Sequence, residues 1–188
     1  MVAFKNGDED AFAELVQRHQ RPVLNFFFKL VWDSHLAEDM AQEVFLRIFR
    51  HATSYEETAK FTTFLYTIAR NLWIDHVRAR TTEPRAASLD ASPNDGESTL
   101  SDCLPASARS RPDRQAELAE LDARLRKALD ALPEDHRLVV VFSEVCGMRY
   151  QEIATLMKIP VGTVKSRMHT AVFQLRQLLS RKSRSKGD

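Results

Sequence analysis

The sequence predicts an all-α protein made of two small helical domains that are joined by a flexible linker. Apolar residues recur at intervals of three and four along most of the 188 residues, which is the period of an amphipathic helix. Strand-like alternation is nearly absent, and the chain contains only 5 glycines. The helical pattern breaks down over residues 81–115, so we expect a domain on either side of this stretch.

The N-terminal domain is expected over residues 1–80, and it contains a helix with two distinct faces in the segment His35–Tyr55. The apolar face comprises Ala37, Met40, Ala41, Val44, Phe45 and Ile48. The opposite face carries Asp39, Gln42, Glu43 and Arg50, with Leu46 as a lone apolar residue among them. A polar face with one apolar side chain is typical of a helix that docks onto another protein. A solvent-exposed face with a stray leucine would show the same pattern.

A further helix is expected over residues 60–80 of the same domain. Its apolar stripe comprises Phe61, Phe64, Leu65, Ile68 and Leu72. Cations and one amide lie along the same segment: Lys60, Arg70, Asn71, Arg78 and Arg80. Rings interleaved with cations can hold unstacked bases, because rings stack on bases and cations meet phosphates. For Phe61 and Trp73 we favour the simpler interpretation that the rings belong to the core.

The linker prediction for residues 81–115 depends on composition. This stretch contains Pro84, Pro93, Pro105 and Pro112, many Ser, Asp and Ala residues, and no aromatic residue. Such a segment cannot bury enough apolar surface to offset the entropy lost on ordering. We therefore expect a flexible tether between the two domains.

The C-terminal domain is expected over residues 116–182, followed by a basic tail at 183–188. A first amphipathic helix is indicated by the spacing of Leu118, Leu121, Leu125, Leu129 and Leu132. The β-branched run Val139–Phe142 lies within helical spacing and is predicted to be a buried helix. Gly147 marks a turn before a short helix over Tyr150–Met157, and a final long helix is expected over Thr163–Leu179.

The last two helices form the pattern of a helix-turn-helix, because a turn of about four residues joins them and the second is basic. Ala154 is placed where the helices cross, with Ile153, Leu156 and Val164 between them. The outward groups at the start of the last helix are Thr163, Lys165, Ser166, Arg167, His169 and Thr170. These side chains can reach base edges and phosphates in the major groove. An ordinary helical hairpin with a charged outer face is the alternative.

The charge distribution supports a polyanionic partner, because residues 158–188 contain eight Lys or Arg and one Asp while the whole chain has a net charge of +1. No secretory signal or membrane-spanning run is evident, so a cytoplasmic protein is expected. Cys103 and Cys146 offer neither a disulfide framework nor a metal site, and whether either has a redox role stays open. We find no catalytic constellation and expect no metal, cofactor or small-molecule substrate.

Four segments together resemble the extracytoplasmic-function sigma factors of bacterial RNA polymerase, the smallest class of the sigma-70 family. They are GDEDAFAELVQRH, AEDMAQEVFLRIFR, FTTFLYTIARNLWIDHVR, and the segment from Leu132 to Arg176 that contains GTVKSR. They occur in the order that the family shows and cover most of the chain outside the linker. Each segment is a weak signal alone, whereas their combination is specific.

The resemblance implies that the first domain binds the clamp coiled coil of core RNA polymerase. The implied polymerase-binding residues are Asp39, Gln42, Glu43, Leu46 and Phe49. The same domain would recognise and melt the minus-ten element through Lys60, Phe64, Arg70, Asn71 and Arg78, with the loop Ala52–Ala59 around a flipped base. The second domain would read the double-stranded minus-thirty-five element through Thr163, Lys165, Ser166, Arg167 and His169 and would touch the polymerase flap. An anti-sigma protein is a further implied partner.

Three positions depart from the family pattern, and one rival function remains. Phe64 stands where the family has tryptophan, and Thr170 stands where a basic residue is frequent. Lys158 replaces a frequent glycine, which costs roughly 1 kcal/mol if the position needs a positive φ. The rival is a stand-alone helix-turn-helix regulator that binds a palindromic operator as a dimer. A nucleic-acid enzyme is disfavoured because no paired carboxylates or metal ligands are evident.

Overall fold

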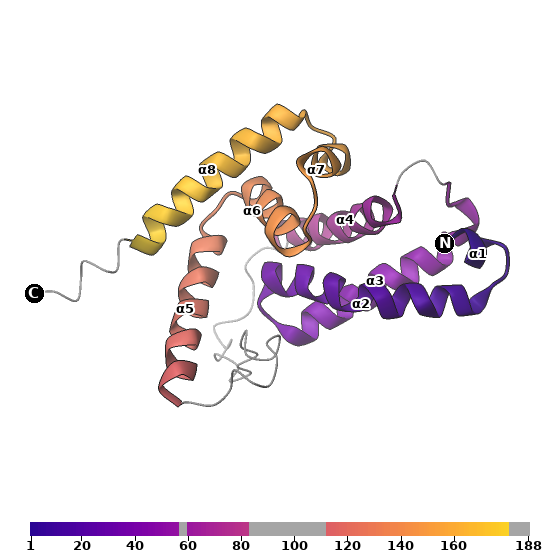
Figure 1. Cartoon of the computed structure of the whole chain (residues 1–188), viewed down its shortest axis with the longest axis horizontal. Coiled ribbons are helices and arrows are strands. Elements are labelled where there is room, and N and C mark those ends of the chain that lie inside the picture. The colour runs from indigo at the N-terminus through magenta and orange to yellow at the C-terminus, as the bar shows by residue number, and fades with distance from the viewer. Residues whose placement is uncertain (57–59, 83–111, 181–188) are drawn as a thin grey trace, which may run out of the picture.

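The computed structural model of the chain describes residues 1–56, 60–82 and 112–180 (Figure 1). Every regular element within these ranges is a helix, which confirms the all-α prediction. The predicted basic tail at 183–188 lies outside the described residues, as does most of the predicted linker. Helices reach into both ends of the predicted linker, because one ends at Thr82 and the next begins at Pro112.

The first half of the chain consists of α1 (Val2–Lys5), α2 (Glu9–Val31), α3 (Ser34–Arg50), η1 (Ala52–Ser54) and α4 (Phe61–Thr82). Two aspartates begin the longer helices: Asp8 accepts from the Ala11 amide and Asp33 from the Leu36 amide, both at 3.0 Å. Such side-chain caps satisfy amides that have no partner within the helix. Trp32 ends α2 in the left-handed region, and the cap at Asp33 follows at once. The chain therefore reverses sharply, and α3 packs along α2.

The second half consists of α5 (Pro112–Asp130), α6 (Glu134–Val140), the π-helical turn η4 (Val141–Val145), α7 (Tyr150–Met157) and α8 (Val161–Ser180). The predicted buried helix at Val139–Phe142 is confirmed, since all four residues are buried. Gly147 has a φ of +63°, as its predicted turn requires. The helix predicted over Tyr150–Met157 is also confirmed, and the final helix begins two residues before the predicted Thr163.

The turn of the helix-turn-helix is closed by Lys158 in the left-handed conformation, with a φ of +56°. The Ile159 amide donates to the Ala154 carbonyl at 3.0 Å, and the Lys158 amide donates to Thr155 at 3.3 Å. This pair of bonds is the Schellman motif, which usually has glycine at the left-handed position. Ala154, Ile153 and Val164 are buried where the two helices meet, as predicted.

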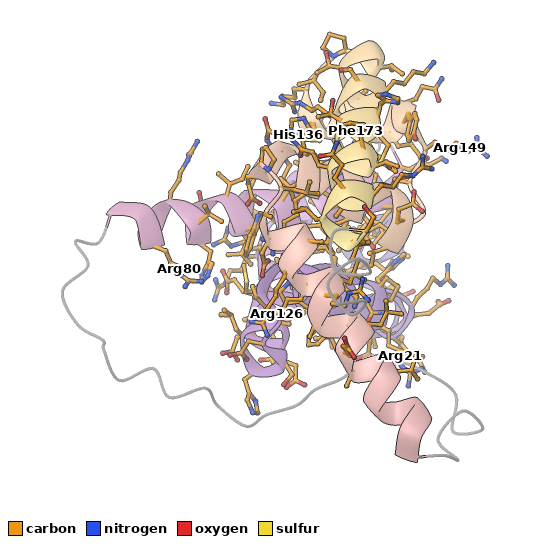
Figure 2. The ribbon with its side chains drawn as sticks, turned by 90° about the vertical axis from the view of Figure 1, so that its left-hand side faces the viewer. Arg21, Arg80, Arg126, His136, Arg149 and Phe173 are labelled. Atoms are coloured by element: carbon orange, nitrogen blue, oxygen red, sulfur yellow. The ribbon has the colours of Figure 1, made fainter. Side chains whose placement is uncertain are left out.

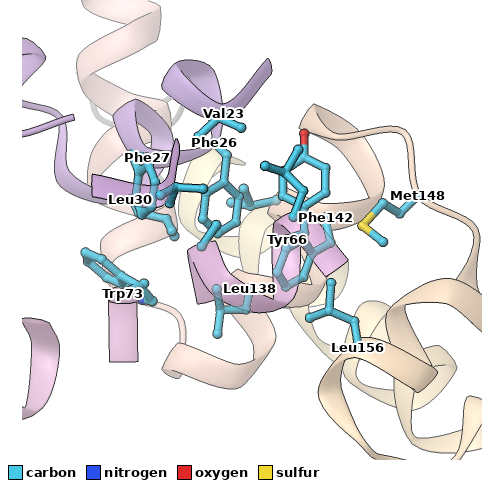
Figure 3. Packing of buried hydrophobic residues seen from close by; sticks show 14 of the residues in the cluster. Val23, Phe26, Phe27, Leu30, Tyr66, Trp73, Leu138, Phe142, Met148 and Leu156 are labelled. Atoms are coloured by element: carbon cyan, nitrogen blue, oxygen red, sulfur yellow. The ribbon is translucent and has the colours of Figure 1, made fainter. Parts of the chain in front are cut away.

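The two halves of the chain are packed against each other and share one apolar core. Buried residues of α2 and α4 belong to the same cluster as buried residues of α6, η4 and α7. Figure 3 shows the centre of this cluster, where Phe26, Tyr66 and Phe142 come from α2, α4 and η4 respectively. The sequence predicted two tethered domains without a relative placement, and the structure places them in contact.

We predict that Lys158→Gly stabilises the protein by about 1 kcal/mol, because glycine occupies the left-handed region without the clash of a Cβ atom. The free energy of unfolding, measured by urea titration followed by circular dichroism, checks this value. Lys158→Ala is the matched control, since it removes the charge but keeps the Cβ. Equal stability of the glycine and alanine variants would contradict a conformational cost at this position.

Candidate nucleic-acid and protein interfaces

The outward face of α3 carries the residues that the sequence predicts for docking. Asp39 and Gln42 are exposed, Leu46 is 49% exposed and Phe49 is 54% exposed. Large apolar side chains with this exposure on a helix that also has a fully buried face are candidates for contact with a partner. The structure thus brings four of the five predicted residues into solvent on one helix.

Glu43, the fifth predicted docking residue, is held by a neighbour on the same helix. Its carboxylate accepts from Arg47 Nε at 2.8 Å, and both side chains are about one third exposed. This hydrogen bond, together with the charges of Arg47 and Arg50, holds the pKa of Glu43 below its usual value. The carboxylate therefore stays ionised and is held against α3, where a partner cation would have to compete with Arg47 for it.

Phe49 belongs to a cluster of three rings that the sequence analysis did not find. Its ring centroid lies 5.3 Å from those of Phe4 and Phe12, which are themselves 4.7 Å apart. Lys5 Nζ donates to the Tyr55 carbonyl at 2.8 Å, which ties α1 to the segment that follows α3. Phe12 is part of one of the four family-like segments, but only the packing of α1 and α2 on α3 shows that these rings adjoin the docking face.

The five predicted minus-ten residues do not form one exposed patch. Phe64, Asn71 and Arg78 are spaced by seven residues and therefore share one stripe of α4, which Lys60 continues before the first turn. Asn71 and Arg78 are exposed, whereas Phe64 is half-buried with its ring 5.0 Å from that of Tyr55. Arg70 lies off this stripe, and among the described residues its buried Nε has no hydrogen-bond partner.

Lys60, at the end of this stripe, is bound to the second half of the chain. Its Nζ lies 2.6 Å from the carboxylate of Glu152 in α7. The hydrogen bond from Lys60 is the largest cause that lowers the pKa of Glu152, and a hydrogen bond from the Arg149 amide is the second. A cation that the sequence assigns to DNA is therefore neutralised by an acid of the other half.

The interpretation of Trp73 as a core residue is confirmed by its exposure of only 5%. Phe61 is half-buried and lies 5.2 Å from the ring of His19. Residues 57–59 of the loop that was expected to hold a flipped base lie outside the described residues, and Ala52–Ser54 form the short helix η1.

The start of α8 presents most, but not all, of the predicted minus-thirty-five residues to solvent. Lys165, Ser166 and His169 are exposed, and Thr163 is half-buried with its carbonyl accepting from Ser166 Oγ at 3.0 Å. Arg167 instead turns toward α6, where its Nη2 lies 2.8 Å from Asp135. Arg167 follows the buried Val164 by three residues, so it occupies the flank of the helix rather than its outer face.

The outer face of α8 continues into an exposed apolar residue. Phe173 is 58% exposed and follows His169 by about one helical turn. Figure 2 labels Phe173 on α8. The exposed side of this helix therefore changes from polar groups at its start to a ring further along. Helical periodicity alone predicts no role for Phe173.

Potential metal ligands and the thiol of Cys146 were the remaining candidates for chemistry within the described ranges. No group of three or more potential metal-ligating side chains is found there. Burial raises the pKa of the Cys146 thiol to about 12, so this residue is not a reactive thiolate. Among the described helices, none combines the length and the apolar content that crossing a membrane requires.

Comparisons with known proteins find one family region in each half of the chain. Residues 15–83 match Sigma-70 region 2, and residues 122–175 match Sigma-70, region 4. The RNA polymerase sigma-H factor of Pseudomonas aeruginosa is 34% identical over 170 residues, which cover 89% of this chain and 85% of that protein. The ECF RNA polymerase sigma factor SigW of Bacillus subtilis is 32% identical over 175 residues, covering 93% and 92% respectively.

A solved structure supports the fold over nearly the full length. The sigma factor RpoE in complex with the anti-sigma factor NepR from Bartonella quintana has a TM-score of 0.65 at 22% identity. The matched region covers 92% of this chain and 98% of that chain. Both halves therefore have counterparts in one known two-part helical fold.

We predict that Cys146 reacts slowly with iodoacetamide at pH 8 in the native chain and rapidly after unfolding. The reason is that burial raises the pKa of its thiol and leaves little thiolate at this pH. Peptide mass spectrometry resolves alkylation of Cys146 from that of Cys103. Equal rates of Cys146 alkylation before and after unfolding would show that the thiol is accessible and ionisable in the native state.

Proposed function

Since the chain belongs to the extracytoplasmic-function sigma factors of the sigma-70 family, we propose that it binds core RNA polymerase and directs promoter-specific initiation. Sigma factors act in transcription initiation and are not enzymes. The observation that carries the proposal is the joint match of both family regions, in order, to the two halves of one chain.

We assign polymerase docking to the outward face of α3. Exposed Leu46 and Phe49 supply apolar contact, while Asp39, Gln42 and Glu43 supply polar groups around them. A central apolar residue surrounded by polar groups is the usual composition of an energetically important interface. The partner surface is the clamp coiled coil, and the Phe4–Phe12–Phe49 cluster lies at the margin of the docking face.

Recognition and melting of the minus-ten element are assigned to the stripe of α4 that comprises Lys60, Phe64, Asn71 and Arg78. Rings and cations along one helix face suit a single strand, since each captured base contributes roughly 1–3 kcal/mol through stacking. The sequence has no P-loop, so strand separation draws on binding free energy. Arg70 lies off the stripe, so we propose a smaller contribution of this residue to minus-ten recognition.

Reading of the minus-thirty-five element is assigned to the first turns of α8. Lys165, Ser166 and His169 project to solvent from the amino-terminal end of a helix that follows a helix-turn-helix turn. Arg167 reaches DNA only by exchanging its contact with Asp135, so we assign it to a phosphate at the edge of the site. The same half of the chain is proposed to touch the polymerase flap.

An anti-sigma protein is the proposed regulator of this chain. The structurally similar RpoE was solved in complex with the anti-sigma factor NepR. The exposed docking residues of α3 are the surface at which such a protein would compete with polymerase. Run-off transcription with purified core polymerase and a promoter library tests the proposal as a whole.

Replacing two docking residues should weaken assembly with polymerase. We expect Gln42→Ala with Leu46→Ala to raise the Kd for core polymerase at least about tenfold, which corresponds to roughly 1.4 kcal/mol. Fluorescence anisotropy of labelled protein measures this affinity. Leu121→Ala is the control, because Leu121 is 53% exposed on α5, a helix of the other half of the chain. An unchanged affinity with an unchanged circular dichroism spectrum would remove α3 from the interface.

Replacing one reading residue should affect DNA but not polymerase. We expect Lys165→Ala to weaken holoenzyme binding to the minus-thirty-five element by several-fold, because a phosphate or base-edge contact is lost. Polymerase affinity should stay at the wild-type value. Lys127→Ala is the control, since it removes an exposed lysine on α5, outside the first turns of α8. Equal loss of DNA and polymerase binding in Lys165→Ala would contradict the assignment.

A further inference from the structure

A cavity of about 370 Å³ lies where the ends of α2, α4 and α5 meet the start of α6. No residue that we assign to polymerase or to DNA lines it. Its apolar walls are formed by Leu30, Val31, Val77, Trp32 and Trp73. Its volume falls within the range of about 300–1,000 Å³ in which proteins bind small molecules. The cavity is therefore a candidate ligand site that is separate from the surfaces described above.

Aromatic rings give this cavity flat apolar surface. His76 stacks on Trp73 with ring centroids 5.8 Å apart and planes 25° apart, and both residues line the cavity together with Trp32. Burial lowers the pKa of His76, and the charge of Arg80 acts in the same direction, so the imidazole is uncharged at neutral pH. A planar apolar ligand can pack against such rings with little polar surface left unpaired.

The two carboxylates of the cavity are already engaged by donors of the protein. Asp130 Oδ1 accepts from Trp32 Nε1 at 3.3 Å and lies 3.1 Å from Arg137 Nη1. The carboxylate of Glu134 accepts from Trp73 Nε1. A cationic ligand would have to displace these buried donors and leave them without partners, which is costly. The acids therefore hold the walls of the cavity in place and do not make it a site for cations.

Two guanidinium groups at the cavity remain available to a ligand. Arg80 is exposed and makes no hydrogen bond or ion pair within the described ranges. Arg126 Nε lies 3.9 Å from Asp130 Oδ2, a long ion pair that leaves its other donors unoccupied. Together with Arg137, three guanidinium groups face two carboxylates, so the lining keeps a net positive charge. Planar guanidinium groups bind carboxylates through paired, charge-assisted hydrogen bonds.

We propose that this cavity binds a small aromatic carboxylate. The ring of the ligand packs against Trp32 and Trp73, and its carboxylate pairs with Arg80 and Arg126. A neutral aromatic compound lacks the second interaction and an aliphatic acid lacks the first, so the cavity discriminates against both. The inference goes beyond the proposed function and does not depend on it, because none of these residues belongs to the polymerase or DNA surfaces.

The affinity test uses the full chain and cinnamate as the probe. We expect isothermal titration calorimetry at pH 8 to show saturable binding at one site with a Kd below about 1 mM. Cinnamamide keeps the shape and the ring but has no charge, and acetate keeps the charge but has no ring. Each of these two compounds should bind at least about tenfold more weakly than cinnamate.

The location of binding is tested by NMR and by two variants. Trp32 and Trp73 are the only tryptophans of the chain, so cinnamate should shift both indole N–H signals with the Kd found by calorimetry. Arg80→Gln and Arg126→Gln should each weaken cinnamate binding at least about threefold, because each removes a guanidinium group. The matched control is Arg21→Gln, an exposed arginine of α2 outside the cavity lining, which should bind like the wild type. Figure 2 labels all three arginines.

The proposal is overturned if cinnamate does not bind saturably, or if cinnamamide binds equally well. It is also overturned if the two cavity variants keep the affinity of the Arg21→Gln control, since binding would then lie elsewhere. Circular dichroism checks the fold of each variant. If a cavity variant does not fold, the indole signals of the wild-type chain decide, because signals that cinnamate leaves unchanged would exclude the cavity. Failure of the chain to bind core polymerase would reject the proposed function and leave this inference standing.

Discussion

The stack of Phe26 on Phe142 is the contact on which the arrangement of this molecule depends. It joins a helix of the first half to the π-helical turn of the second, and both rings are excluded from water. Because apolar burial is worth about 25 cal/mol per Å², these rings strongly favour contact between halves that the chain connects only through a long segment. Arg137, Trp73 and Lys60 each pair with a residue of the other half of the chain in addition to this stack.

Burial at this contact also dictates the chemistry of the groups around it. Burial lowers the pKa of the Arg137 guanidinium, while Asp130 and Glu134 act in the opposite direction. A buried cation needs compensating partners, and here the Leu30 carbonyl accepts from Nη2 and the Asp130 carboxylate pairs with Nη1 at 3.1 Å, while the buried Nε has no hydrogen-bond partner among the described residues. Such a set of polar contacts makes the contact specific in its geometry, yet each group can find water when the halves separate.

The proposed docking and reading surfaces differ in how far internal contacts occupy them. The outer face of α3 and the start of α8 are largely exposed. On the α4 stripe, by contrast, Lys60 pairs with Glu152 and the ring of Phe64 packs against that of Tyr55. The surface proposed for the minus-ten element is thus the one most involved in internal contacts.

Local pattern was sufficient for the helices, the turn at Gly147 and the wedge of Ile153, Ala154 and Val164, because each depends on residues that are near one another in sequence. Exposure of Leu46 and burial of Trp73 also followed from helical periodicity. Helical periodicity did not predict three other features: the three-ring cluster around Phe49, the contact of Arg167 with Asp135, and the packing of the two halves. Their partners lie on other helices, at distances along the chain that no periodicity relates. Only tertiary packing decides which helix faces meet. The same ring or charged side chain on a helix can face water or a neighbouring helix, so the local pattern does not distinguish the two.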